Sequence, residues 1–193
     1  MPNTSATAIF LDRDGVLNKN VRYTGSDEWE APRAAADFEM VPGAIAAVAS
    51  LQHGGYRLFL VSNQPNMAKG KAQRADHDAI HAKFLSHLDE AGIILQEAYY
   101  CFHHPKGIIP ALSDACDCRK PSPYFLHKAK KDYDLDMARS WMIGDRDTDI
   151  QCGRAAGVRT IQISDKPRGT LLQYPDHVAP SIVEAAQIIL AAS

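Results

Sequence analysis

The sequence predicts an α/β protein: a Rossmann-like three-layer α/β/α sandwich whose sheet is mainly parallel. Apolar runs of strand length alternate with helical patterns along the chain, and glycine or proline separates many of them. Because neighbouring parallel strands need right-handed crossovers, this alternation places helices on both faces of one sheet. The length of 193 residues, 46% of them hydrophobic, suits a single domain, residues 1–193, with a substantial core.

Five short apolar runs are expected to form buried parallel strands. Bulky aliphatic and aromatic residues dominate them, as is typical of strands covered on both faces. In order, they occupy residues 8–11, 56–61, 98–102, 140–143 and 158–163. Active sites of open parallel sheets lie beyond the carboxyl ends of the strands, so the residues that follow these runs are the first candidates for chemistry.

Five helices are expected after these strands. The first begins at Pro42-Gly43 and ends at Gly54-Gly55, and the second shows apolar residues at helical spacing up to Gly92. The remaining boundaries give helices at residues 72–91, 121–133, 148–156 and 181–191. Two irregular segments, residues 19–41 and 102–120, are too long for simple connections, which indicates functional loops.

Composition excludes several classes of partner. The formal net charge of -2, without a Lys/Arg stripe, argues against nucleic-acid binding. No stretch approaches the roughly 18 apolar residues of a membrane span, so no membrane partner is expected. The polar N-terminus lacks signal-peptide features, and we therefore expect a cytoplasmic protein with reduced cysteines. A monomer is the expected state.

Acidic residues follow the first and fourth expected strands. Asp12 and Asp14 come directly after the first strand, before a turn at Gly15, and Asp145 follows the fourth. Alone, each motif could be a solvated turn, and Asp149 could cap a helix N-terminus. Two close carboxylates repel one another, however, and require a cation or a shared proton.

Groups suited to phosphate occupy the same expected edge of the sheet. Ser62 ends the second strand, and Arg119-Lys120 precedes a helix whose N-terminal amides also favour anions. Carboxylates of Asp12 and Asp145 are the hard ligands that Mg²⁺ prefers. A carboxylate beside such a metal can attack phosphorus, giving an aspartyl-phosphate that water hydrolyses. The order of these motifs predicts phosphoryl transfer.

The sequence resembles the haloacid dehalogenase-like phosphatase superfamily, whose four motifs match across residues 9–157. The resemblance implies that Asp12 is the nucleophile and Asp14 the general acid and base. It also implies that Ser62 and Lys120 bind the phosphoryl group, and that Mg²⁺ is held by Asp12, the Asp14 carbonyl and Asp145. Asp149 matches a second acid of the fourth motif, which could bind metal through water or cap the helix.

Cysteine and histidine form a second cluster. The C-x-H hook of Cys101 and His103 and the C-x-C hook of Cys116 and Cys118 supply three thiolates and one imidazole. Such a closed tetrahedral set is typical of structural Zn²⁺, here in a zinc loop at residues 101–118. His104 is a competing ligand, and Cys152 is expected to pack on a helix.

The combined motifs resemble the D-glycero-D-manno-heptose 1,7-bisphosphate phosphatases, and most are shared with the histidinol-phosphate phosphatases. This branch implies loops instead of a large cap domain, with a recognition loop at residues 19–41. It implies a sugar phosphate substrate for lipopolysaccharide or capsule synthesis, with the 7-phosphate removed. The implied substrate-binding residues are Asn20, Arg22, Tyr23, Ser62, Asn63, Gln64, Arg119 and Lys120.

Departures from the branch leave substrate choice open. The first loop, through Trp29 and Pro32, is long, Pro65-Asn66 replaces a small pair, and Arg146 stands where Lys is common. Histidinol phosphate or another sugar monophosphate is therefore an alternative substrate. A remote alternative is an inactive zinc-stabilised binding protein, which the complete set of motif residues disfavours.

Overall fold

The computed structural model describes residues 5–166 and 174–192. A six-stranded sheet with the order β5-β4-β1-β6-β7-β8 forms its centre. Every neighbouring pair in this sheet is parallel, which confirms the expected mainly parallel sheet. The strands are β1 (Ala8–Leu11), β4 (Arg57–Asn63), β5 (Leu95–Cys101), β6 (Trp141–Gly144), β7 (Arg159–Ile163) and β8 (His177–Ala179).

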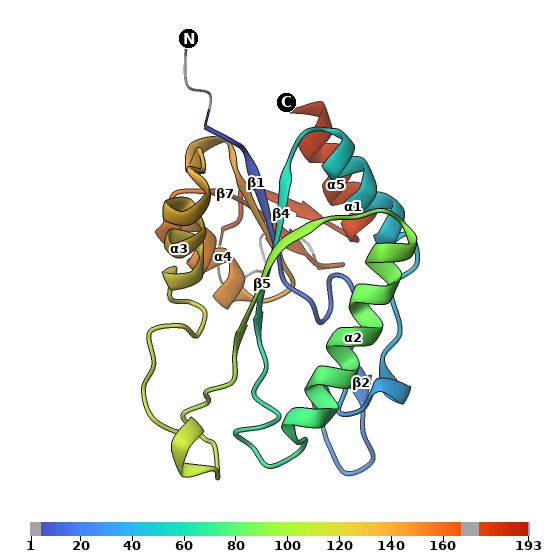
Figure 1. Cartoon of the computed structure of the whole chain (residues 1–193), viewed down its shortest axis with the longest axis vertical. Helices are drawn as coiled ribbons and strands as arrows, with labels where there is room; N and C mark the ends of the chain where they lie inside the picture. Colours follow the sequence, from blue (N-terminus) through green and yellow to red (C-terminus); the bar gives the residue numbers. More distant parts are fainter. Residues whose placement is uncertain (1–4, 167–173, 193) are drawn as a thin grey trace.

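Helices cover both faces of the sheet and complete the three layers that the sequence predicts (Figure 1). One face carries α1 (Ala44–His53), α2 (Arg74–Glu90) and α5 (Ile182–Ala191), and the other carries α3 (Tyr124–Tyr133) and α4 (Asp147–Ala156). Three 3-10 turns, Ala35–Asp37, Pro110–Leu112 and Met137–Arg139, lie in the connections.

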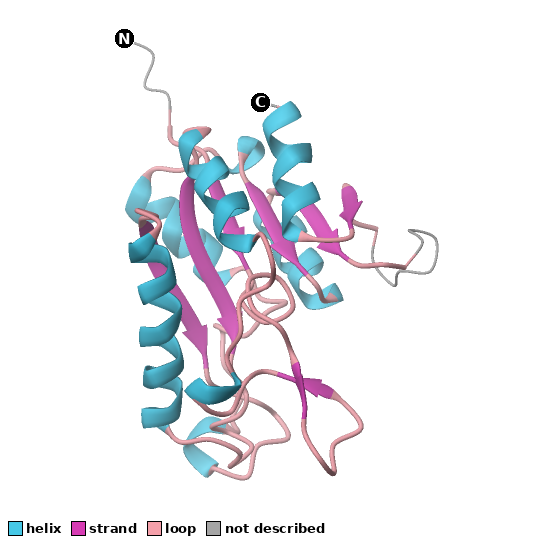
Figure 2. Ribbon diagram, turned by 90° about the vertical axis from the view of Figure 1, so that its right-hand side faces the viewer, coloured by secondary structure: helices cyan, strands magenta, loops and turns pink. Residues whose placement is uncertain are grey.

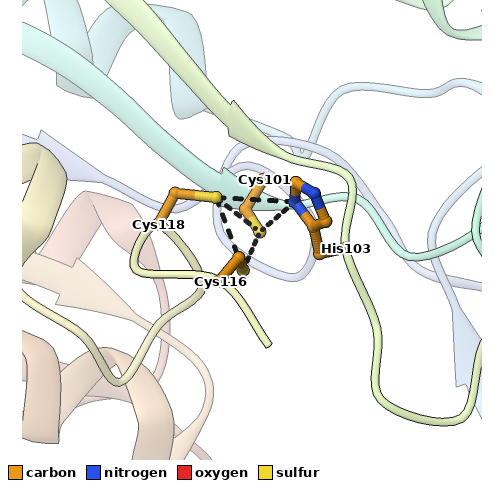
Figure 3. Close-up of side chains that lie close together, drawn as sticks. All are labelled: Cys101, His103, Cys116 and Cys118. Atoms are coloured by element: carbon orange, nitrogen blue, oxygen red, sulfur yellow. Dashed lines mark hydrogen bonds between the residues drawn. The ribbon is translucent and has the colours of Figure 1, made fainter. Parts of the chain in front are cut away.

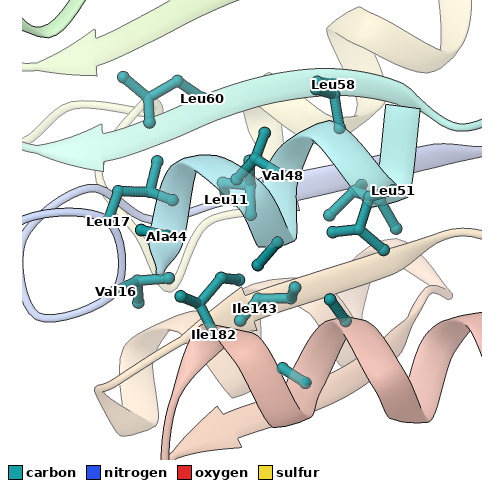
Figure 4. Packing of buried hydrophobic residues seen from close by; sticks show 14 of the residues in the cluster. Leu11, Val16, Leu17, Ala44, Val48, Leu51, Leu58, Leu60, Ile143 and Ile182 are labelled. Carbon is teal, nitrogen blue, oxygen red and sulfur yellow. The ribbon is translucent and has the colours of Figure 1, made fainter. Parts of the chain in front are cut away.

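Strand β1 shows why the sheet needs both helical layers. Ile9 and Leu11 point into the core beneath α1, α2 and α5, whereas Ala8 and Phe10 belong to the core beneath α3 and α4. All four residues are at most 1% exposed. Figure 4 shows Leu11 among Val48, Leu51 and other members of the first core. A continuous apolar run is therefore required here instead of an alternating one.

The structure adds strands that the sequence analysis did not predict. Strand β8 extends the sheet beyond β7, and β2 (Val21–Arg22) pairs antiparallel with β3 (Trp29–Glu30) inside residues 19–41. These strands have two or three residues, too few for a periodic pattern. Figure 2 shows this small hairpin beyond the arrow ends of the central strands. Among the described residues, no helix has the length and apolar character to cross a bilayer.

Candidate active site

The carboxyl ends of three central strands bring the predicted acidic and phosphate-binding residues together. Asp12 continues β1, and its amide donates a hydrogen bond to the carbonyl of Ile143 in β6 at 2.9 Å. Asp145 follows β6, and Ser62 lies near the end of β4, the other neighbour of β1. The parallel register thus gathers at one edge residues that are distant in sequence.

Lys120 lies at the centre of this group. Its Nζ atom is 2.9 Å from Asp12 Oδ1 and 2.6 Å from Asp149 Oδ1, and it donates to the carbonyl of Val61 at 2.6 Å. The main chain of Lys120 is fixed by two hydrogen bonds of 3.1 Å with the side-chain amide of Asn63. Burial lowers the pKa of Lys120, but the two carboxylates outweigh burial and raise the pKa above its ordinary value.

Three carboxylates form a cluster beside this lysine. One oxygen each of Asp12, Asp145 and Asp149 lies within 4.8 Å of the others. Burial is the main cause that raises the pKa of Asp12 to about 6 and that of Asp145 to about 7. Neighbouring carboxylates act in the same direction, and the ammonium of Lys120 acts against them. Oδ1 of Asp145 is buried without a hydrogen-bond partner in the described structure. The donor set fits a hard divalent cation, which would neutralise this charge.

Gly15 makes room for Asp145. A Cβ atom at this position would lie 2.2 Å from Oδ2 of Asp145, and the backbone φ of +85° is one that glycine favours. The side-chain nitrogen of Asn20, a predicted substrate contact, also lies 2.8 Å from that Cβ position. The turn after β1 therefore brings both side chains against its own backbone.

Asp14 is held by three side chains. Its carboxylate accepts hydrogen bonds from Arg13 Nη2 at 3.1 Å, Asn18 Nδ2 at 3.0 Å and Gln64 Nε2 at 2.6 Å. Gln64, a predicted substrate residue, also donates to Ser62 Oγ at 3.0 Å. Arg13 is fully buried, and the sequence analysis gave it no role. The position of Arg13 between two aspartates was the sequence feature that could have indicated its ion pair with Asp14.

The Cys/His cluster is assembled from both hooks (Figure 3). The Sγ atom of Cys101 lies 3.1 Å from Cys118 Sγ and 3.6 Å from Cys116 Sγ, and His103 Nδ1 lies 3.7 Å from Cys118 Sγ. Zn–S bonds of about 2.3 Å in a tetrahedron separate sulfur atoms by about 3.8 Å, so the spacing is near that of a four-ligand site.

The alternative imidazole of His104 is engaged elsewhere, because its Nδ1 accepts a hydrogen bond from the amide of Lys106 at 3.0 Å. Cys152 packs in the core beneath α3 and α4, as expected. Arg119 Nη1 donates to the carbonyl of His103 at 3.0 Å. The Cys/His loop and the cationic pair Arg119-Lys120 are thereby joined.

A pocket of about 210 Å³ opens over Asp12, Asp14 and Asp149, whereas Asp145 is not among its lining residues. Of the predicted substrate residues, Asn63, Arg119 and Lys120 line this pocket, whereas Ser62, Gln64, Asn20, Arg22 and Tyr23 are not among its lining residues. The hydroxyl of Tyr23 instead donates to Asp37 at 2.6 Å, and Arg22 is exposed on β2. Further lining residues are Asp12, Asp14, Glu28, Trp29, Glu30, Ala31, Pro65, Asn66, Lys69, Arg146, Asp147, Thr148 and Asp149.

The β2–β3 hairpin supplies the wall that the sequence analysis did not resolve. Trp29 lines the pocket while remaining 60% exposed. Asn66 Nδ2 donates to the carbonyl of Ala31 at 3.2 Å, which joins the hairpin to the segment after β4. The sequence analysis expected residues 19–41 to recognise the substrate but did not predict that Trp29 lines the pocket. A tryptophan in an otherwise polar loop was the sequence feature that could have indicated this.

The parallel sheet with its lysine-paired aspartates defines a haloacid dehalogenase-like hydrolase. The HAD-hydrolase-like family model matches residues 117–185. A solved structure of D,D-heptose 1,7-bisphosphate phosphatase from B. bronchiseptica, complexed with magnesium and phosphate, superposes with a TM-score of 0.76. It is 27% identical, and the match covers 97% of this chain and 99% of that one.

Curated relatives define the family more closely. D-glycero-beta-D-manno-heptose-1,7-bisphosphate 7-phosphatase of Salmonella typhi is 39% identical over 81% of this chain and 79% of its own. D-glycero-alpha-D-manno-heptose-1,7-bisphosphate 7-phosphatase of Photorhabdus laumondii is 34% identical over 82% of each chain. The chain therefore belongs to the family of D-glycero-D-manno-heptose-1,7-bisphosphate 7-phosphatases and is a phosphatase.

Proposed function

We propose that the protein is a Mg²⁺-dependent phosphatase that removes the 7-phosphate of a D-glycero-D-manno-heptose 1,7-bisphosphate. The observation that carries this proposal is the buried contact of Lys120 with Asp12 beside Asp145 and Asp149. The names of the relatives at 34–39% identity support the sugar. Both anomers occur in those names, so both are candidate substrates.

In the proposed first step, a carboxylate oxygen of Asp12 attacks phosphorus, and the bond from phosphorus to the sugar oxygen breaks. Asp14 gives its proton to that oxygen, and Lys120 and Ser62 stabilise the charge on the phosphoryl oxygens. In the second step Asp14 removes a proton from water, which attacks the aspartyl-phosphate and releases phosphate and Asp12. The three donors to Asp14 support this role because they fix the direction of its carboxylate.

Two metals complete the proposal. Asp12, the carbonyl of Asp14 and Asp145 would hold Mg²⁺, which supplies charge neutralisation between the carboxylates and the phosphate. Asp149 forms an ion pair with Lys120 and accepts a hydrogen bond from the Arg146 amide at 3.0 Å. Because its carboxylate is already engaged, an indirect role of Asp149 in binding Mg²⁺ is favoured.

Cys101, His103, Cys116 and Cys118 would hold a structural Zn²⁺ that fixes the loop preceding Arg119. A reducing cytoplasm would keep these thiols available for the metal. The proposed catalytic unit is the single domain of residues 1–193, acting as a monomer.

A phosphate-release screen with Mg²⁺ tests the proposed reaction. The substrates are both anomers of heptose 1,7-bisphosphate, heptose 7-phosphate and histidinol phosphate. We expect the highest kcat/KM for one heptose bisphosphate anomer. A higher kcat/KM for histidinol phosphate would overturn the sugar assignment while keeping the chemistry, and release from none of the substrates would overturn the proposed function.

A further inference from the structure

Besides Arg119, Lys120 and Arg146, the pocket is lined by a fourth cationic residue, Lys69, in the turns that follow β4. The backbone around it is fixed at three points. The Lys69 amide donates to the carbonyl of Pro65 at 3.0 Å, and the carbonyl of Ala68 accepts from the amides of Ile108 and Ile109 at 2.7 and 3.1 Å. Lys69 is therefore held between the β4 edge and the Cys/His loop.

The charge of Lys69 is not neutralised by a direct partner. Lys71, two residues on, lies 2.7 Å from Glu30 Oε1, and Arg33 lies 3.0 Å from the other oxygen of that carboxylate. Within the described structure, Lys69 Nζ has neither an ion pair nor a hydrogen bond. Glu30 is thus already paired with two other cations, and the ammonium of Lys69 is left for a ligand in the pocket.

Arg119 is another cation that lines this pocket, and its charge acts on Lys69. One of its nitrogens is taken by the His103 carbonyl, which anchors the guanidinium and leaves other donors available. Burial lowers the pKa of Lys69, and the positive charges of Lys71 and Arg119 lower it further, although Glu28 and Glu30 act in the opposite direction. Two like charges brought together in one pocket favour an anion between them.

Lys120 does not serve this purpose, because Asp12, Asp149 and the Val61 carbonyl already surround its Nζ atom beside the proposed nucleophile. A bisphosphate, however, brings a second dianion into the same pocket. This second phosphate group needs cations other than Lys120, away from the catalytic carboxylates Asp12 and Asp14.

We propose that Lys69, together with Arg119, binds the phosphate that is not cleaved, and that Lys69 thereby sets the preference for a bisphosphate over a monophosphate. This inference rests on the proposed function. It assigns Lys69 to substrate recognition and gives it no part in the chemical step.

The test compares two substrates in the Lys69→Met variant, which removes the charge and keeps a long side chain. We expect kcat/KM for heptose 1,7-bisphosphate to fall about 10- to 100-fold, mainly through KM, as for a lost charge-assisted hydrogen bond. The value for heptose 7-phosphate should change less than about threefold, and Lys69→Arg should restore most of the preference. Lys106→Met, an exposed lysine outside the pocket lining, is the matched control and should behave as wild type.

The outcomes separate the two proposals. Equal losses on both substrates, or no loss on either, would overturn the assignment of Lys69. Wild-type protein that cleaves the monophosphate as well as the bisphosphate would overturn it too, while leaving the phosphatase function intact. Wild-type protein that cleaves neither would overturn the proposed function itself. Equal Tm values for wild type and Lys69→Met would exclude unfolding as the cause of a loss.

Discussion

Nζ of Lys120 lies 2.9 Å from Oδ1 of Asp12, and both side chains are almost completely buried. The lysine reaches this position from the turn before α3, where Asn63 of β4 holds its main chain. The same ammonium contacts Asp149 of α4. The buried charge of Lys120 therefore joins the segments after β1 and before α3 to helix α4. Removing this charge should lower the stability of the folded protein strongly.

Lys120→Met should lower the free energy of unfolding by about 3–5 kcal/mol at about pH 8, because it leaves buried carboxylates without their cation. The loss should be smaller at about pH 5, where those carboxylates can take up protons instead. Urea unfolding of metal-free protein measures both values. Lys128→Met removes an exposed ion pair with Asp132 and should have little effect. Equal losses for the two variants would contradict the role of burial.

Asp12→Asn should reduce kcat at least about 10³-fold, because an amide cannot form the aspartyl-phosphate. Phosphate release under single-turnover conditions measures this, with mass spectrometry to detect the phosphorylated wild-type chain. Asp27→Asn, an exposed acid of the recognition loop, is the control and should retain activity. Persistent turnover by Asp12→Asn would refute the proposed nucleophile.

Metal-free protein should gain stability from Asp12 and Asp145 as the pH falls from about 8 to about 5. Burial raises the folded pKa values to about 6 and about 7, above the ordinary 3.8, so the folded state binds more protons than the unfolded state in this range. Mg²⁺ competes with those protons and should raise Tm more at about pH 8 than at about pH 5. Thermal scans with and without Mg²⁺ check this, and a larger Mg²⁺ effect at the lower pH would contradict it.

Gly15→Ala should impair catalysis far more than Gly25→Ala. Both glycines have positive φ, of +85° and +80°, but an added Cβ at position 15 would meet Asp145 and Asn20, whereas nothing lies within 4 Å of a Cβ at position 25. The control should lose about 1 kcal/mol of stability from backbone strain alone. We expect kcat/KM of Gly15→Ala to fall at least about 100-fold with weaker Mg²⁺ activation. Similar activity in both variants would show that crowding of Asp145 does not matter.

Metal analysis should find about one zinc per chain. Cys118→Ser should abolish zinc binding, lower Tm by at least about 5 °C and raise KM, since Arg119 follows this ligand. Cys152→Ala is the matched control because Cys152 lies in the core, outside the cluster. Its zinc content should equal that of wild type, and zinc retained by Cys118→Ser would argue against the proposed ligand set.

Much of the candidate site could be predicted because its chemistry is attached to strong local patterns. Asp12 and Asp145 directly follow fully buried strands, and the two Cys/His hooks have the spacing of a metal site. Parallel strands end at a common edge, so the order of motifs along the chain was sufficient to bring these residues together. Strand boundaries were less exact: β5 begins at Leu95, before the expected residue 98, because the first half of this edge strand is not fully buried.

By itself, the sequence determined the three-layer fold, the positions of the acidic motifs and the two candidate metal sets, because each motif is a local pattern and parallel strands end at a common edge. Only the tertiary structure decided that Gln64 contacts Asp14, that Asp149 pairs with Lys120, and that Trp29 and Lys69 line the pocket. These relationships join separate loops, and their geometry is set by how the hairpin and the Cys/His loop pack over the sheet edge. Packing between distant segments leaves no periodic signal in the sequence.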